Sequence, residues 1–267
     1  MARQHTGGPA LPLYLSEPGR ALADYGMYLA ARPFESLLPH GDGHPVLVLP
    51  GLLADDTSTR VLRTVLRRLD YRVHGWRCGR NFGPTARAFR GMRDRIDDLH
   101  DRYGRPISLI GWSLGGIYAR ALARRTPDAV RQVITLGSPF RLSSQDQSRA
   151  ARAYERYAHL HVEHLDLPLE RGAAPLPVPA TSIYSHFDGI VAWQACLDTP
   201  GERAENIAVM ASHLGLGHHP AAIWAIADRL AQPEGTWAPF RPPLFLRPAF
   251  PRPAAPTPRD LPDAPAA

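Results

Sequence analysis

Short apolar runs and longer amphipathic segments alternate along the chain from residue 45 onward. The apolar runs have the length of strands that are buried on both faces. In the segments between them, apolar residues at spacings of three and four predict amphipathic helices. We expect strands at 46–49, 71–76, 107–110, 130–136, 180–184 and 206–210, and helices at 57–69, 85–103, 114–125 and 220–230. This alternation predicts an α/β fold with a mostly parallel central sheet and helices on both faces.

The regular pattern also gives the expected domain boundaries. We expect the α/β domain at 45–232, preceded at 1–44 by an irregular lead-in with one helix near 20–31. Ten prolines fall in the last 29 residues, which excludes a regular helix or a central strand there. We therefore expect a proline-rich tail at 233–267, extended or disordered, in which 244–250 could pack on the surface.

The segment 140–177 interrupts the alternation, because it contains no expected strand. Within it, 146–160 has helical character, with Tyr154 and Tyr157 on one side. We interpret the segment as a small helical cap inserted into the α/β domain. The side with the two tyrosines could either pack against the core or cover an apolar pocket. In the second case Tyr154 is a candidate substrate contact.

Charge and cysteine content narrow the function classes. The formal net charge is +6, and all 31 basic residues are arginine. The arginines are spread along the chain and mixed with acidic residues, as in 93–98, which is typical of solvated helix faces. The chain has no basic block and no nucleic-acid-binding motif, so we expect no nucleic-acid partner. Two cysteines are too few for a disulfide framework.

Neither a membrane helix nor a secretion signal is expected. The longest uncharged apolar stretch, around 107–119, is shorter than the ~18 residues that a membrane helix needs. Gly and Pro interrupt every apolar stretch of 1–19, so the continuous apolar centre of a secretion signal is missing. We therefore expect a cytoplasmic protein.

The strongest chemical signal is the sequence Gly-Trp-Ser-Leu-Gly at 111–115, between an expected strand and an expected helix. In this context the pattern predicts a nucleophile elbow, a sharp turn that presents Ser113. Gly111 and Gly115 would remove side chains that clash with the neighbouring chain. The positive start of the following helix favours an oxyanion that develops there. We expect Ser113 to be the nucleophile and Trp112 to be a substrate contact beside it.

A serine nucleophile needs a general base, and the base needs an acid that orients it. In this architecture the acid and then the base follow the serine along the chain, each in a loop after a later strand. Asp188 and His213 occupy such loops. We therefore expect the triad Ser113, Asp188 and His213. The alternatives left open are Asp166 and Asp198 for the acid, and His186, His218 and His219 for the base.

These motifs resemble the α/β-hydrolase superfamily, in its lipase/esterase-like branch. The resemblance covers about 45–230 and rests on Leu-Pro-Gly-Leu at 49–52, Gly-Trp-Ser-Leu-Gly-Gly at 111–116, Leu-Gly-Ser-Pro at 136–139, Asp-Gly-Ile-Val at 188–191 and Ser-His at 212–213. It implies an oxyanion hole built from the N–H group of Leu114 and a second N–H from the loop after the first central strand. In that loop Leu52 is the expected donor and Leu53 the next choice. Pro50 stands where the family often has a histidine.

The resemblance implies a serine hydrolase that cleaves small-molecule carboxylic esters and needs no cofactor. Acyl transfer, perhydrolysis, and thioester or amide hydrolysis use the same triad, and a non-catalytic hydrolase-like binding protein is an alternative of another class. Asn81 and Phe82 follow a strand at the same sheet edge and are candidate pocket residues, although a tight turn explains them equally well. The insert contains a cluster of residues whose side chains can bind metal ions: His159, His161, Glu163 and His164. We interpret these side chains as solvated and expect no metal there.

Overall fold

The computed structural model describes residues 8–141, 147–162, 175–199 and 201–254. In this part of the chain, six parallel strands form one sheet in the order β2-β1-β3-β4-β5-β6. The strands are β1 (Pro45–Leu49), β2 (Arg72–Gly75), β3 (Ile107–Trp112), β4 (Val130–Leu136), β5 (Ala180–Ser185) and β6 (Ala204–Val209). The six expected strands and their parallel arrangement are thus confirmed.

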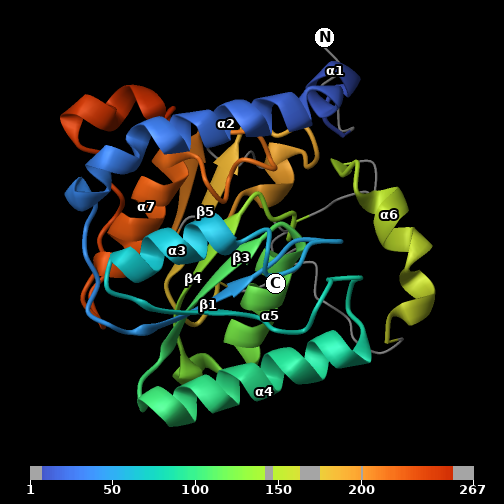
Figure 1. Ribbon diagram of the computed structural model, residues 1–267. Helices are drawn as coiled ribbons and strands as arrows, with labels where there is room; N and C mark the ends of the chain where they lie inside the picture. Colours follow the sequence, from blue (N-terminus) through green and yellow to red (C-terminus); the bar gives the residue numbers. More distant parts are fainter. Residues whose placement is uncertain (1–7, 142–146, 163–174, 200, 255–267) are drawn as a thin grey trace, which may run out of the picture.

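Helices cover both faces of this sheet (Figure 1). The long helices after β1 are α3 (Arg60–Arg68), α4 (Ala86–Tyr103), α5 (Leu114–Arg125) and α7 (Pro220–Ala231), with short 3-10 helices η2 (Pro127–Ala129) and η5 (Trp193–Cys196). Val46 and Val48 of β1 join the core packed by α3 and α7, whereas Leu47 and Leu49 join the core packed by α4 and α5. Successive side chains of a strand point to opposite faces, so this apolar run fits a strand that is covered on both sides.

The N-terminal segment contains the helix expected near 20–31, and its described part holds more helix than the irregular lead-in expected at 1–44. It forms α1 (Leu11–Leu15), α2 (Glu17–Ala31) and the 3-10 helix η1 (Arg32–Leu37). In Figure 1, α2 runs along the top of the molecule, next to α7. Its buried residues are Glu17, Asp24 and Tyr28, whose spacings of seven and four place them on one helix face. Because two of the three are carboxylates, the apolar pattern alone does not reveal that this face is buried.

The insert contains a shorter helix than the one expected at 146–160. It forms α6 (Ala151–Arg156) and the 3-10 helix η4 (Ala158–Leu160). Ser148 before these helices pairs with Val191, and His161 after them pairs with Thr85, both in antiparallel bridges, so the helical part is bounded on both sides. The rest of the insert, at 142–146 and 163–174, lies outside the described residues.

The described part of the proline-rich tail packs on the protein surface. It contains the 3-10 helix η6 (Leu244–Ala249). The Phe240 and Phe250 rings lie 4.9 Å apart, and both pack against the core cluster that includes α7. Within 244–250, Ala249 and Phe250 pack against this cluster, whereas Leu244 and Phe245 are largely exposed. Residues 255–267 lie outside the described part of the chain.

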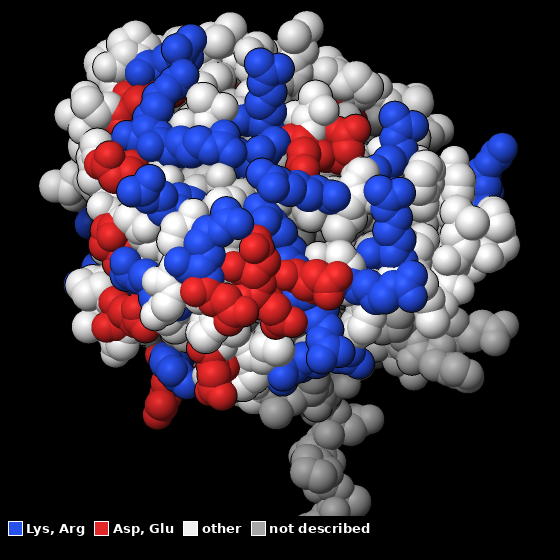
Figure 2. Space-filling model, turned by 60° about the horizontal axis from the view of Figure 1, so that its bottom comes forward, with Lys and Arg blue, Asp and Glu red and all other residues white. Residues whose placement is uncertain are grey.

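Arginine and acidic side chains are mixed on the face that carries α4 (Figure 2). Asp98 forms ion pairs with Arg95 at 2.7 Å and with Arg102 at 3.2 Å, at the helical spacings of three and four. The arginines there form rows that Asp and Glu interrupt, as expected for a solvated helix face. Within the described ranges, no helix combines the length and the apolar character needed to cross a membrane.

Candidate active site

The expected nucleophile lies at a strained turn between β3 and α5. Ser113 has φ 53° and ψ −121°, and residues other than glycine rarely adopt a positive φ. A Cβ at Gly111 would overlap the backbone of Gly115 and Gly116. A Cβ at Gly115 would lie only 2.8 Å from the Pro50 carbonyl oxygen. The glycines of the motif thus let neighbouring backbone segments meet around Ser113.

The expected acid and base are hydrogen-bonded to each other. His213 Nδ1 lies 2.6 Å from Asp188 Oδ2, and both side chains are buried. Asp188 Oδ1 accepts hydrogen bonds from the N–H groups of Ile190 at 2.9 Å and Val191 at 2.7 Å, as an ionised carboxylate does. In the neutral imidazole, Nδ1–H donates to Asp188 Oδ2, and Nε2 then presents a lone pair.

Opposing effects set the pKa of His213. Burial lowers this pKa, but the charge and hydrogen bond of Asp188 and the charge of Glu17 raise it, and the net pKa lies above the usual histidine value. The surroundings therefore favour the imidazolium form. A general base that must hold a proton in the transition state benefits from such surroundings.

Ser113 lies beside this acid–base pair at the carboxyl edge of the sheet. Its N–H donates to the carbonyl oxygen of Leu136, the residue before Gly137, at 2.8 Å. A Cβ at Gly137 would lie 3.0 Å from both Asp188 Oδ2 and His213 Nδ1. Among the described residues no hydrogen bond joins Ser113 Oγ to His213, and such contacts often tighten only when substrate is bound. These contacts join the Ser113 backbone to the end of β4, where Gly137 adjoins the Asp188 and His213 side chains.

Two expected oxyanion donors have unused N–H groups. Among the described residues, neither the Leu52 nor the Leu114 N–H has a protein acceptor, whereas the Leu53 N–H donates to the Asn81 carbonyl oxygen at 2.6 Å. A Cβ at Gly51 would lie 3.2 Å from the Cβ of Ser113, so the loop passes directly beside this serine. The geometry therefore favours Leu52 over Leu53 as the partner of Leu114.

Asn81 supports this loop and does not face a pocket. Its side chain is fully buried, and its Nδ2 donates to the Pro50 carbonyl oxygen at 2.9 Å. Its Oδ1 accepts hydrogen bonds from the Gly83 N–H and the Tyr118 hydroxyl, both at 3.1 Å. Because its polar atoms bind protein groups, the expectation that Asn81 contacts substrate is corrected to a supporting role.

Trp112 likewise supports the site from the core. The side chain is 8% exposed and belongs to the core cluster that includes α7. Its Nε1 donates to the His213 carbonyl oxygen at 3.1 Å, and a Cβ at Gly217 would lie 2.6 Å from its ring. The expected substrate contact is therefore an anchor for the loop that carries His213.

Phe82 and Tyr154 lie where the insert meets the loop after β2. The Phe82 ring is 5.0 Å from the Tyr157 ring, and the Tyr154 ring is 4.6 Å from the His161 ring. Tyr154 packs partly against the core, and burial raises its pKa. Tyr154 and Tyr157 thus contact different neighbours, and both rings remain candidates for a pocket wall.

The alternative acids are not placed to orient His213. Asp198 forms an ion pair with Arg120 at 2.6 Å, and both side chains are buried. Asp166 lies outside the described residues. Of the acids that the structure describes, Asp188 is the one hydrogen-bonded to the imidazole of the expected base.

The alternative bases have other partners. His218 Nε2 lies 3.1 Å from the Ala21 carbonyl oxygen, and the His219 side chain accepts a hydrogen bond from the first turn of α7. The His186 ring packs against Trp193 with ring centres 4.5 Å apart. These contacts explain the three histidines without a catalytic role.

A second Ser–His–Asp chain lies at the opposite edge of the sheet. His44 Nε2 is 2.8 Å from Ser108 Oγ, and His44 Nδ1 is 2.5 Å from Asp42 Oδ1. Ser108 and His44 are fully buried, so substrate cannot reach this serine. Burial and the charge of Arg131 lower the pKa of His44 to about 4, which keeps the imidazole neutral at physiological pH. The chain of hydrogen bonds is therefore structural.

The buried carboxylates of α2 were missed by the sequence reasoning. Glu17 and Asp24 hydrogen-bond to backbone N–H groups in the loops that carry Asp188 and His213. The signal that could have found them is their shared helix face with Tyr28, which is a buried aromatic residue. Two acids on the inner face of a helix require buried donors.

The suspected metal cluster is only partly described. Glu163 and His164 lie outside the described residues, and His161 Nε2 lies 2.9 Å from the Phe82 carbonyl oxygen. Within the described ranges, no group of three or more His, Cys, Asp or Glu side chains is arranged to hold a metal ion.

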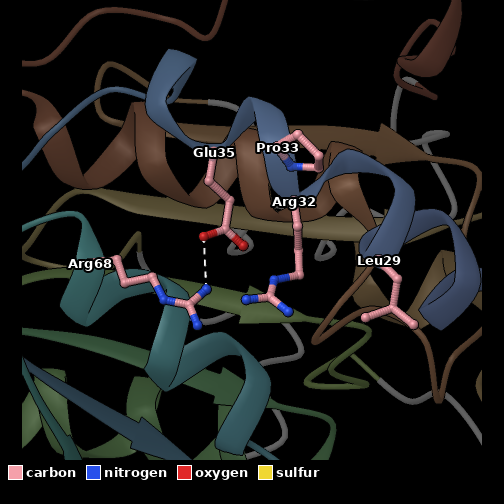
Figure 3. Close-up of a pocket in the computed structure, with 5 residues that line it drawn as sticks. All are labelled: Leu29, Arg32, Pro33, Glu35 and Arg68. Atoms are coloured by element: carbon pink, nitrogen blue, oxygen red, sulfur yellow. Dashed lines mark hydrogen bonds and ion pairs between the residues drawn. The ribbon is translucent and has the colours of Figure 1, made fainter.

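A surface pocket of about 540 Å³ lies far from the triad (Figure 3). Its lining residues are Leu29, Arg32, Pro33, Glu35 and Arg68, and the last two form an ion pair at 2.9 Å. At 1.5 Å per residue, Leu29 lies about 18 Å along α2 from Glu17, which contacts the triad loops. The lining contains no nucleophile and no base, so this pocket is not the candidate active site.

Comparisons with known proteins identify the fold. No protein-family model and no curated protein sequence matches the chain. Aspergillus fumigatus lipase B matches with a TM-score of 0.58 and 17% identity. The match covers 73% of this chain and 55% of that lipase. A thermophilic esterase from Thermogutta terrifontis has a TM-score of 0.51 and 19% identity, covering 71% of this chain and 90% of the esterase. An α/β hydrolase from the metagenome of lagoon sediments of Mar Chica, Morocco, has a TM-score of 0.51 and 16% identity over 71% of this chain and 90% of its own. The chain therefore has the α/β-hydrolase fold that its motifs predict.

Proposed function

We propose that this protein is a serine hydrolase that cleaves small-molecule carboxylic esters with Ser113, His213 and Asp188. The observation that carries the proposal is the buried 2.6 Å hydrogen bond between Asp188 and His213, next to a serine with a positive φ. The fold shared with a lipase and an esterase supports the same reaction class. The proposed reaction uses no cofactor.

In the proposed reaction, Ser113 Oγ attacks the carbonyl carbon of the ester while His213 Nε2 accepts the hydroxyl proton. The carbonyl oxygen becomes an oxyanion, which the N–H groups of Leu52 and Leu114 stabilise. His213 then donates the proton to the leaving oxygen, so that the alcohol departs and an acyl ester remains on Ser113. A water molecule next loses a proton to His213 and attacks the acyl carbon. The acid departs as Ser113 regains its proton.

The pKa of His213 predicts how the activity depends on pH. Only the neutral imidazole can accept the serine proton, so kcat/KM should rise with pH through this pKa. Burial lowers the pKa, but Asp188 and Glu17 raise it further than burial lowers it. The midpoint of the acid limb is therefore expected above the ordinary histidine value.

A fluorophosphonate probe, with the labelled residue located by mass spectrometry, tests the proposal. We expect labelling at Ser113 in the wild type, and Ser113→Ala should abolish it and lower turnover of nitrophenyl esters by ~10³-fold or more. Ser108→Ala is the matched control, because its serine is hydrogen-bonded to histidine but buried; labelling should persist in it. His213→Ala should abolish labelling, whereas His218→Ala and His219→Ala should retain it. A folded wild type that neither reacts with the probe nor cleaves esters contradicts the proposal and favours a non-catalytic binding protein.

A further inference from the structure

The buried carboxylate of Glu17 joins the loop that carries Asp188 to the loop that carries His213. Glu17 Oε1 accepts hydrogen bonds from the N–H groups of Gly189 at 2.7 Å and His213 at 3.1 Å. Glu17 Oε2 accepts a third from the Leu214 N–H at 3.1 Å. The side chain is 2% exposed. One carboxylate therefore holds the residue after the acid, the base itself and the residue after the base.

Arg20 extends this connection to the residue before the acid. Its guanidinium forms an ion pair with Glu17 at 2.7 Å. The same group donates to the carbonyl oxygens of Phe187 at 2.6 Å and Leu13 at 2.8 Å. Burial of a carboxylate is costly unless donors satisfy it, and Glu17 has four donors. The carboxylate is thus held in a fixed place against both loops.

Glycines in the two loops allow α1 and α2 to approach this closely. A Cβ at Gly189 would lie 2.7 Å from the Leu13 carbonyl carbon and 2.9 Å from Glu17 Cγ. A Cβ at Gly215, two residues after His213, would overlap the Asp24 carboxylate. These positions tolerate no side chain while the helix is in place.

We propose that Glu17 is a positioning residue for the triad, which sets the separation of the Asp188 and His213 loops and places a negative charge beside the imidazolium. This inference rests on the proposed function. The carboxylate contacts neither substrate nor the reacting atoms. It acts through the His213 backbone, which it fixes, and through the imidazole, whose positive form it stabilises.

Several charged groups lie near the His213 imidazole, and they differ in their effect on the pKa of this residue. Asp188 faces the imidazole from the loop after β5, and Glu17 faces it from α2. Arg20 is paired with Glu17 and offsets part of its charge. Asp24, from the same helix, accepts hydrogen bonds from the backbone N–H and the hydroxyl of the neighbouring Ser212. Removing the Glu17 charge should therefore lower the pKa of His213, whereas removing the Arg20 charge should raise it.

Four variants of the full chain test the inference. Glu17→Gln removes the charge and turns one accepting oxygen into a donor. Glu17→Asp retains the charge on a side chain too short to hold both loops. Arg20→Gln removes the offsetting positive charge, together with the guanidinium hydrogen bonds to the Phe187 and Leu13 carbonyl oxygens. Glu205→Gln is the matched control, because Glu205 is also a glutamate with little exposure (13% of its side chain) that accepts from an arginine, Arg229, and from a backbone N–H, that of Phe240. It lies on β6, away from the triad loops.

The measurements are kcat and KM for nitrophenyl butyrate against pH, the NMR titration of the His213 imidazole, and unfolding in urea. Glu17→Gln should lower kcat by roughly 10-fold to 100-fold with little change in KM, since small displacements of catalytic groups have effects of this size. Its acid limb and its imidazole titration should both move to lower pH. Glu17→Asp should lower kcat while keeping the wild-type titration. Arg20→Gln should move the titration to higher pH, and Glu205→Gln should lower stability alone.

The possible results separate this inference from the proposed function. If Glu17→Gln loses stability as Glu205→Gln does, but keeps the wild-type kcat and titration, Glu17 is only a structural anchor and the inference is wrong. If Glu17→Gln does not fold, the other two variants decide. The inference is then wrong if Arg20→Gln keeps the wild-type imidazole titration and Glu17→Asp keeps the wild-type kcat. If the wild type cleaves no ester, the proposed function fails, and the imidazole titrations then decide the inference without any activity.

Discussion

Replacing Asn81 by alanine tests whether the loop that carries Leu52 must be held in place for catalysis. The Asn81 side chain binds the Pro50 carbonyl oxygen, the Gly83 N–H and the Tyr118 hydroxyl. The variant leaves these three buried groups without a partner. Each buried group without a partner costs about 1–3 kcal/mol. Because the surrounding structure relaxes, the three costs add to less than their full sum, and the free energy of unfolding should fall by about 3–5 kcal/mol.

The same variant should slow the reaction without weakening substrate binding. Pro50 lies two residues before Leu52, so its release lets the oxyanion loop move away from the nucleophile. Loss of one oxyanion donor lowers kcat by ~10²–10³-fold in serine enzymes. That donor interacts with charge that develops only in the transition state, so KM should stay within about threefold of the wild type.

Steady-state kinetics with nitrophenyl butyrate and urea unfolding on the same samples make this test. Tyr118→Phe is the matched control, because it removes one hydrogen bond to Asn81 but keeps the bond to Pro50. Its stability should fall by about 1 kcal/mol, and its kcat should stay within about threefold. If Asn81→Ala loses the expected stability but keeps the wild-type kcat, the Asn81 side chain does not hold an oxyanion donor at Leu52 in place, and the reasoning is refuted.

Three further predictions concern the acid, the pH dependence of stability and the substrate. Asp188→Asn should fold and lower kcat by ~10³-fold or more, because an amide nitrogen next to His213 favours the wrong tautomer; a wild-type rate would exclude Asp188 as the acid. Burial and Arg131 hold the pKa of His44 at about 4, whereas an unfolded chain titrates near 6.5. Between pH 6.5 and pH 4 the unfolded chain binds a proton at His44 and the folded protein does not, so the free energy of unfolding should fall by up to about 3 kcal/mol. Urea unfolding measures this fall, which should be smaller in His44→Asn. If Phe82, Tyr154 and Tyr157 line an apolar acyl pocket, kcat/KM for nitrophenyl esters should peak between butyrate and decanoate, each methylene contributing up to ~0.8 kcal/mol; an optimum at acetate would remove these rings from the pocket.

The sequence could predict the strands and the elbow because their determinants are local. A continuous apolar run such as 107–110 reports a strand buried on both faces, and β3 lies there. The turn at Ser113 needs glycines on either side of it, and both are within two residues of the serine. Asp188 and His213 could be placed at one edge because parallel strands present their carboxyl ends together.

The supporting residues could not be predicted because their partners are distant in the chain. Glu17 binds the N–H of His213, which lies 196 residues away, and a glutamate in a helix is usually exposed. Asn81 looks like a turn residue until its partner Pro50 is known. Trp112 adjoins the nucleophile in sequence, but its ring points into the core because successive strand residues face opposite sides.

The buried Ser108–His44–Asp42 chain and the proposed Ser113–His213–Asp188 triad contain the same residue types in different surroundings. Ser108 lies inside a regular strand and is fully buried, whereas Ser113 stands on a strained turn that presents its hydroxyl. The surroundings of the two imidazoles also differ in charge. Burial and two arginines, Arg131 and Arg105, outweigh Asp42 and lower the pKa of His44, so that imidazole stays neutral. At His213 burial also lowers the pKa, but two carboxylates outweigh it, and the imidazole can take up a proton. Backbone strain, access and the sign of the neighbouring charge therefore favour Ser113 over Ser108 as the nucleophile of the proposed reaction.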